Sequence, residues 1–130
     1  MKKEQFEYLA NQVFLAALEV HKNLGPGLLE SVYEFALVKE LQLRDVEIQY
    51  QVKVPLFYKG YDTGKEFYID ILVDNEIIIE VKAVEVLHPV HDAQLLSYLK
   101  LADKRMGFLI NFNVPLIKNG IKRKVNNYYP

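Results

Sequence analysis

Three charged residues interrupt the two most apolar runs of this 130-residue sequence. Asp70 lies within the run 66–73 (EFYIDILV). Glu80 and Lys82 lie within the run 77–84 (IIIEVKAV), and because they are two residues apart they point to the same face of a strand. Burying a charge is costly unless it is paired or binds a metal ion, so these side chains require a partner.

The turn between the two runs decides whether Asp70 joins that face. A two-residue turn would leave Asp70 on the opposite side of the sheet from Glu80. A three-residue loop, residues 74–76, places the two opposite each other, and Asn75 tolerates the left-handed conformation that such loops need. Because Asp70 would otherwise be buried among aliphatic side chains, we expect the three-residue loop or an equivalent bulge.

Two carboxylates held close together repel each other, and a divalent cation removes that repulsion. Carboxylate oxygens suit Mg²⁺ or Mn²⁺, and Mg²⁺ commonly completes its shell with water and substrate phosphate. Lys82 beside such a site can stabilise the charge that develops during phosphoryl chemistry. The alternative is an ion pair between Lys82 and one carboxylate that holds the sheet together. Two carboxylates, one lysine and a further acid nearby favour the metal site.

The further acid is Glu30, which borders the apolar stripe of an expected helix over residues 28–43. Gln94 and Tyr98 are four residues apart on another expected helix, residues 89–102, and face the same way. Gln94 can hydrogen-bond a carboxylate or a ligated water, and Tyr98 can contact phosphate. Taken singly, Glu30 would be an ordinary surface residue of the first helical turn, and Gln94 or Tyr98 a capping or packing residue.

The periodicity of the apolar residues predicts the elements that carry these side chains. Spacings of three and four indicate helices, alternation indicates a half-buried strand, and runs that are apolar on both parities indicate central strands. The expected order is helices 5–24 and 28–43, strands 46–54, 66–73 and 77–84, helix 89–102, and strand 107–112. The last helix implies a right-handed crossover between parallel strands, and the remaining tail allows a final hairpin.

These residues occur in an order that resembles a known family. The segment 27–33 (GLLESVY) spells GxxExxY, and it is followed by Asp70, the triplet 80–82 (EVK) and the segment 94–98 (QLLSY). With this set the chain resembles the GxxExxY protein family, a branch of the PD-(D/E)XK nuclease-like superfamily, over nearly its whole length. The resemblance implies an α/β fold with a restriction-endonuclease-like core. Its mixed central β-sheet is flanked by helices in the order α-α-β-β-β-α-β, as a single domain over residues 1–130.

The resemblance also implies an active site. Its metal ligands would be Asp70, Glu80 and Glu30, and its catalytic residues Lys82, Glu30, Gln94 and Tyr98. Residues 68–69 are Tyr-Ile, so the proline of the superfamily's name is missing, as in many members. The implied activity is Mg²⁺- or Mn²⁺-dependent hydrolysis of phosphodiester bonds in DNA or RNA. Because the superfamily also contains inactive members, a catalytically silent module that binds nucleic acid or a protein partner is the alternative.

Charge is divided unevenly along the chain. Residues 1–80 hold 8 Lys or Arg and 14 Asp or Glu, whereas residues 81–130 hold 8 and 3. The basic residues near the end of the chain are candidates for binding a nucleic-acid backbone: Lys118, Lys122, Arg123 and Lys124. Without a neighbouring nuclease site they would more often be a solvated edge. The sequence leaves open a homodimer or membership of a larger complex.

Composition excludes several classes of protein. Hydrophobic residues make up 51% of the chain and charged residues 25%, which is typical of globular proteins. The absence of cysteine excludes disulfides, thiolate nucleophiles and sulfur-ligated zinc. No run approaches the roughly 18 apolar residues of a membrane span, and Glu4 and Glu7 interrupt any signal-peptide core. We therefore expect a cytoplasmic protein with no membrane partner.

Other patterns indicate structure rather than chemistry. His88 and His91 form H-x-x-H at a helix start, where a cap and a surface histidine are favoured because zinc needs more ligands. Tyr128 and Tyr129 can stack on bases, but aromatic packing at a terminus is favoured. No G-x-S-x-G elbow or glycine-rich phosphate loop is present.

Overall fold

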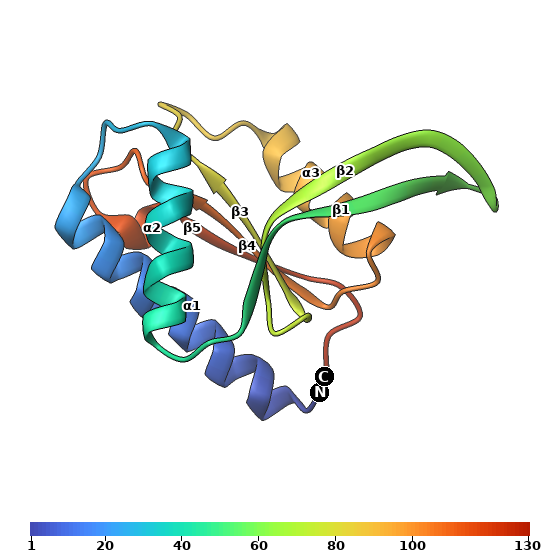
Figure 1. The fold of residues 1–130 in the computed structure, drawn as a ribbon, viewed down its shortest axis with the longest axis horizontal. Helices are drawn as coiled ribbons and strands as arrows, with labels where there is room; N and C mark the ends of the chain where they lie inside the picture. Colours follow the sequence, from blue (N-terminus) through green and yellow to red (C-terminus); the bar gives the residue numbers. More distant parts are fainter.

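A five-stranded mixed sheet forms the centre of the computed structural model, which describes residues 1–130 (Figure 1). The elements are α1 (Lys3–Leu24), α2 (Glu30–Leu43), β1 (Ile48–Tyr58), β2 (Tyr61–Val73), β3 (Ile77–Lys82), α3 (Pro89–Leu101), β4 (Met106–Asn111), the 3-10 helix η1 (Ile117–Gly120) and β5 (Ile121–Val125). This is the α/β architecture and element order that the sequence predicts, with the final hairpin formed by β4 and β5. None of the helices is both long and apolar enough to cross a membrane.

The strands lie in chain order, β1-β2-β3-β4-β5. Only β3 and β4 run parallel, and α3 provides the crossover between them, as expected. The β2–β3 register pairs Val73 with Ile77, which confirms the three-residue loop at 74–76. Asp74 and Asn75 adopt left-handed conformations in that loop, with φ angles of 49° and 58°. The turn therefore sets the register that brings Asp70 towards Glu80.

Helices cover both faces of the sheet. The apolar faces of α1 and α2 pack on one side, where β3 contributes Ile77, Ile79 and Val81 to a cluster of 21 buried residues. On the other side Leu95 and Leu99 of α3 belong to a smaller cluster of seven buried residues. Because β3 is buried on both faces, any charge on it lies in a low-dielectric interior.

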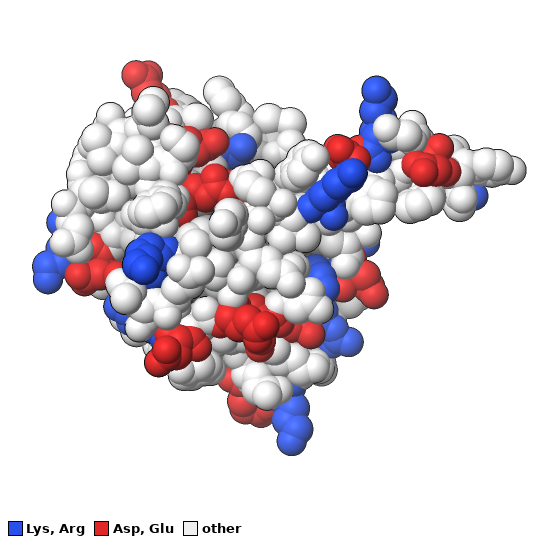
Figure 2. Space-filling model, viewed as in Figure 1, with Lys and Arg blue, Asp and Glu red and all other residues white.

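The β1–β2 hairpin twists sharply where it reaches the site. Ile71 of β2 packs towards α1 and α2, whereas Ile69, two residues earlier, packs towards α3, so the usual alternation is broken between them. The ladder pairs Tyr50 with Ile71 and Val52 with Ile69, but it skips Gln51, whose φ of 50° is left-handed. The twist carries the outer part of the hairpin away from α1 and α2, and the end of the hairpin projects beyond the body of the protein (Figures 1 and 2).

The hairpin is longer than the sequence predicts. Residues 55–58 and 61–65 continue the two strands, although 62–65 carry turn-type residues, and Tyr58 pairs directly with Tyr61. The apolar alternation ends where the hairpin leaves the core, so this part has no burial pattern that could have revealed it. The register shifts just after Pro55, and β1 is an edge strand, as that proline indicates.

Candidate active site

The site lies where β2 and β3 separate. Their backbone pairing runs only as far as Ile71 and Ile79, so the amide of Val81 has no partner on β2. The Asp70 side chain replaces that partner: its Oδ2 accepts a hydrogen bond from the Val81 N–H at 2.8 Å. Asp70 is thus held at the point where the sheet opens. In Figure 2, acidic and basic side chains gather beside α2 and the base of the projecting hairpin.

Glu80 is a buried carboxyl group with an unsatisfied oxygen. The residue is 5% exposed, and its Oε1 has no hydrogen-bond partner. Burial, followed by the negative charge of Asp70, raises the pKa of Glu80 to about 9, and Lys82 offsets this only in part. Alone, Glu80 would therefore be protonated at neutral pH. A cation beside the two carboxyl groups would satisfy the free oxygen and favour the ionised form.

Lys82 ends β3 on the same strand face as Glu80. Its backbone carbonyl accepts a hydrogen bond from the Phe112 N–H at 3.0 Å. The chain beyond it is fixed by the buried Asn111, whose amide exchanges two hydrogen bonds with the backbone of Val84, at 3.0 and 2.9 Å. These contacts hold the end of β3 and so limit where the half-buried lysine can reach.

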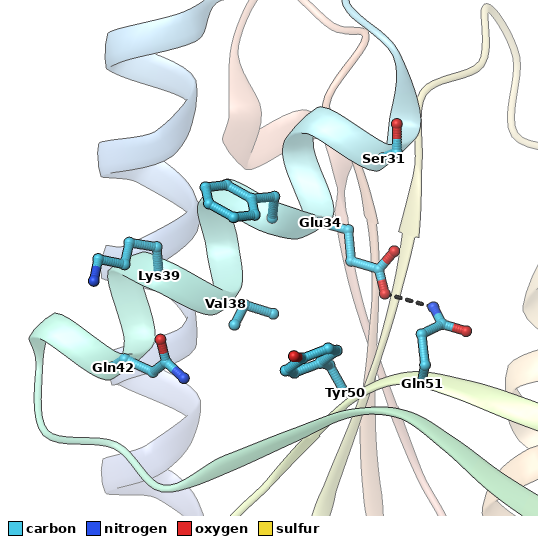
Figure 3. Close-up of a pocket in the computed structure, with 8 residues that line it drawn as sticks. Ser31, Glu34, Val38, Lys39, Gln42, Tyr50 and Gln51 are labelled. Atoms are coloured by element: carbon cyan, nitrogen blue, oxygen red, sulfur yellow. Dashed lines mark hydrogen bonds between the residues drawn. The ribbon is translucent and has the colours of Figure 1, made fainter.

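Glu34 and Gln51 connect the site to α2, and the sequence did not identify either as a site residue. The Gln51 Nε2 donates to Glu34 Oε1 at 2.6 Å (Figure 3). It also donates to Asp70 Oδ1 at 3.3 Å. Burial, together with the charges of Asp70 and Glu30, raises the pKa of Glu34, while the Gln51 hydrogen bond opposes the shift. Three side chains from α2, β1 and β2 therefore form one hydrogen-bonded chain.

The arrangement can hold a divalent ion without being a preformed cage. No three His, Cys, Asp or Glu side chains converge into a ready ligand cluster. The donors at the sheet opening are the carboxylates of Asp70 and Glu80, and oxygen donors of this kind fit Mg²⁺ or Mn²⁺. Water and substrate phosphate would supply the remaining ligands, as Mg²⁺ commonly requires.

Comparison with known proteins fits this geometry. A family model described as the PD-(D/E)XK nuclease superfamily matches residues 7–124. The chain belongs to the PD-(D/E)XK nuclease superfamily. No curated protein and no solved structure matches the chain. Residues 80–82 (EVK) have the (D/E)XK pattern of the superfamily's name.

The GxxExxY segment of this PD-(D/E)XK protein divides into structural and exposed residues. Gly27 has a φ of 93°, which favours glycine in the turn before α2. The buried Tyr33 holds that turn, because its hydroxyl donates to the Gly25 carbonyl at 2.6 Å and accepts from the Leu28 N–H at 3.1 Å. Glu30 is exposed in the first turn of α2, and its charge reaches the site through its effect on Glu34.

The two predicted residues of α3 differ in placement. Tyr98 stacks on Phe67 with ring centroids 4.0 Å apart, and its pKa is raised by burial and then by the charges of Glu80 and Asp70. Gln94 is exposed one helical turn earlier and makes no side-chain hydrogen bond within the chain.

The basic residues of the tail lie at the opposite edge of the sheet from β1. Lys122 and Lys124 contact Asp92 at 3.2 and 3.3 Å, and Arg123 contacts Glu7 at 2.5 Å. Phosphate binding by these three would compete with their ion pairs. Lys118 is exposed on η1.

The remaining sequence candidates have structural contacts. His91 accepts a hydrogen bond from the His88 N–H at 3.1 Å, which is the expected cap of α3. His21 Nε2 lies 2.8 Å from the Val114 carbonyl oxygen. Tyr128 and Tyr129 pack against Phe6, as favoured from the sequence.

Proposed function

We propose that this protein is a nuclease that hydrolyses phosphodiester bonds of DNA or RNA with the help of Mg²⁺ or Mn²⁺. The observation that carries the proposal is the Glu80 carboxyl group, buried with one unsatisfied oxygen beside Asp70 and Lys82. A structural ion pair alone would leave that oxygen without a partner. The motif order further supports membership of the GxxExxY branch.

Each residue has a task that follows from its contacts. Asp70 and Glu80 would hold the ion, with Asp70 oriented by Val81 and Gln51. When bound, the ion would neutralise the carboxylates, polarise the phosphate and make a water molecule a stronger nucleophile. The Lys82 ammonium group would counter the negative charge that grows on the phosphate oxygens.

Glu34, Tyr98, Glu30 and Gln94 would act around this centre. Glu34 would position Asp70 through the shared amide of Gln51. The Tyr98 hydroxyl would hydrogen-bond a phosphate oxygen or a ligated water, and Gln94, which is exposed, would reach only the substrate. Glu30 would tune the charge of Glu34. The basic tail residues would be a second, weaker contact with the nucleic-acid backbone.

The test is cleavage of labelled single- and double-stranded DNA and RNA with Mg²⁺, with Mn²⁺ and with chelator. We expect metal-dependent products from the wild type and a loss of about 100-fold or more in Lys82→Ala. Lys22→Ala is the matched control, because Lys22 is exposed in the last turn of α1 and belongs to neither strand of the site. If the protein binds nucleic acid but cleaves it under none of these conditions, a catalytically silent module is favoured instead. This is the second candidate function because the structure has no preformed ligand cluster.

A further inference from the structure

A groove between α2 and β1 opens next to the proposed active site. Its volume is about 380 Å³, which is within the size range of small-ligand sites. Glu34 and Gln51 form one wall, and the same Gln51 amide contacts Asp70. Figure 3 shows the Tyr50 ring in the groove, between these two residues and Gln42. A molecule in the groove would thus be separated from the Asp70 carboxylate by the Gln51 side chain.

Two aromatic rings in the groove are without aromatic partners. Tyr50 is 62% exposed and Phe35 is 74% exposed, and neither ring stacks on another ring of the chain. An exposed ring on a strand next to a nuclease site is suited to stacking on a nucleobase, which always offers a π face. Tyr50 directly precedes Gln51, so a base stacked on Tyr50 would lie next to the residue that hydrogen-bonds Asp70.

The polar residues of the groove favour a base over an apolar side chain of a protein. Only three of the eight lining residues are hydrophobic. The Gln42 and Gln51 amides both donate and accept hydrogen bonds, as the edge of a base does, and the Lys39 ammonium group can pair with a phosphate. A base offers a ring face to the apolar part of the groove and polar edges to these groups.

We propose that this groove binds one unpaired nucleobase of the substrate, stacked on Tyr50, next to the phosphate that is cleaved. The inference rests on the proposed nuclease function and deepens it by naming the substrate class. A base inside a duplex is already stacked and paired, so only single strands, flaps and frayed ends can fill the groove. The protein therefore prefers single-stranded regions to blunt duplex.

The test compares, in Ca²⁺, binding of a short single strand that carries 2-aminopurine with binding of a blunt duplex. Cleavage is measured separately in Mg²⁺ and in Mn²⁺. We expect the wild type to bind the single strand more tightly and to quench the 2-aminopurine fluorescence by stacking. Tyr50→Leu should weaken single-strand binding by about five-fold or more and remove the quenching, because base stacking is worth about one to three kcal/mol in such sites and about 1.4 kcal/mol is ten-fold. Tyr50→Phe should retain both.

Tyr8→Leu is the matched control, because Tyr8 is 61% exposed on α1, outside the groove. Gln42→Ala provides a second, independent variant and should weaken single-strand binding without changing the thermal unfolding midpoint. If Tyr50→Leu weakens binding of the single strand and of the duplex equally, or weakens neither, the inference is overturned. Metal-dependent cleavage by the wild type would still support the proposed nuclease function. A change of oligomeric state in Tyr50→Leu with unchanged nucleic-acid binding would show a protein interface and overturn it as well. If the wild type neither binds nor cleaves nucleic acid, the proposed function itself fails.

Discussion

Replacing Glu80 with glutamine should stabilise the metal-free protein and remove most of its pH dependence in the neutral range. The folded state raises the pKa of Glu80 from 4.5 to about 9, because the carboxyl group is buried beside Asp70. Folding therefore favours the protonated form. The associated stability is complete below the unfolded pKa and declines as the pH rises towards the folded pKa.

The size of the effect follows from the pKa difference. Each pH unit between the two pKa values lowers the free energy of unfolding by up to about 1.4 kcal/mol. Between about pH 5 and about pH 8 the wild type should thus lose up to about 4 kcal/mol. Glu80→Gln has no proton to lose at this position, so it should lose much less stability over this range and be more stable than the wild type at the upper end.

Urea unfolding followed by circular dichroism, in chelator and at several pH values, measures this directly. Glu85→Gln is the control, because Glu85 is exposed just beyond β3 and should follow the wild-type slope. If Glu80→Gln shows the same slope as the wild type, the carboxyl group titrates normally and our account of the buried site is wrong.

Three further predictions concern the surroundings of the site and one distant ion pair. Gln51→Ala removes the hydrogen bond that orients Asp70 Oδ1, so it should weaken Mn²⁺ binding several-fold with little change in the unfolding midpoint. Calorimetry would measure the Mn²⁺ affinity, and thermal unfolding would measure the midpoint. Tyr98→Phe keeps the aromatic ring and should lower the cleavage rate without changing stability, whereas unchanged single-turnover rates would exclude a role for the hydroxyl. Glu7→Gln should destabilise the fold by at most about 1 kcal/mol, because its pair with Arg123 is largely exposed. Since the pKa of Glu7 is lowered to about 2, that difference should hold above about pH 5 and shrink as the pH falls towards about 2 in urea titrations.

The central pair of carboxyl groups was predictable from the sequence because a carboxylate buried without a partner is costly. Asp70 in an aliphatic run needed a partner, and an odd-length turn or an equivalent bulge supplied Glu80. The structure has that turn, with Val73 opposite Ile77. The order of helices and strands was predictable for a related reason, since apolar residues recur at spacings of three and four in the helices and occupy both faces of the central strands.

Glu34 and Gln51 were not predictable in the same way. Gln51 alternates with apolar neighbours, so its position indicated only an outward-facing polar side chain. Its role depends on the twist of the β1–β2 hairpin, which is set by tertiary contacts on both faces of the sheet. Glu34 shares a helix face with Glu30, and that spacing was the one available signal; the motif drew attention to the earlier, exposed residue.

The central claim is that Asp70 and Glu80 hold a divalent ion, and calorimetric titration of Mn²⁺ tests it most directly. The titration would be performed on the wild type and on Asp70→Asn, each alone and with a short nucleic-acid strand, because substrate phosphate can complete the ligand shell. We predict one binding event in the wild type that is lost in Asp70→Asn. Equal heats from both proteins, or no binding by the wild type even with the strand present, would contradict the account.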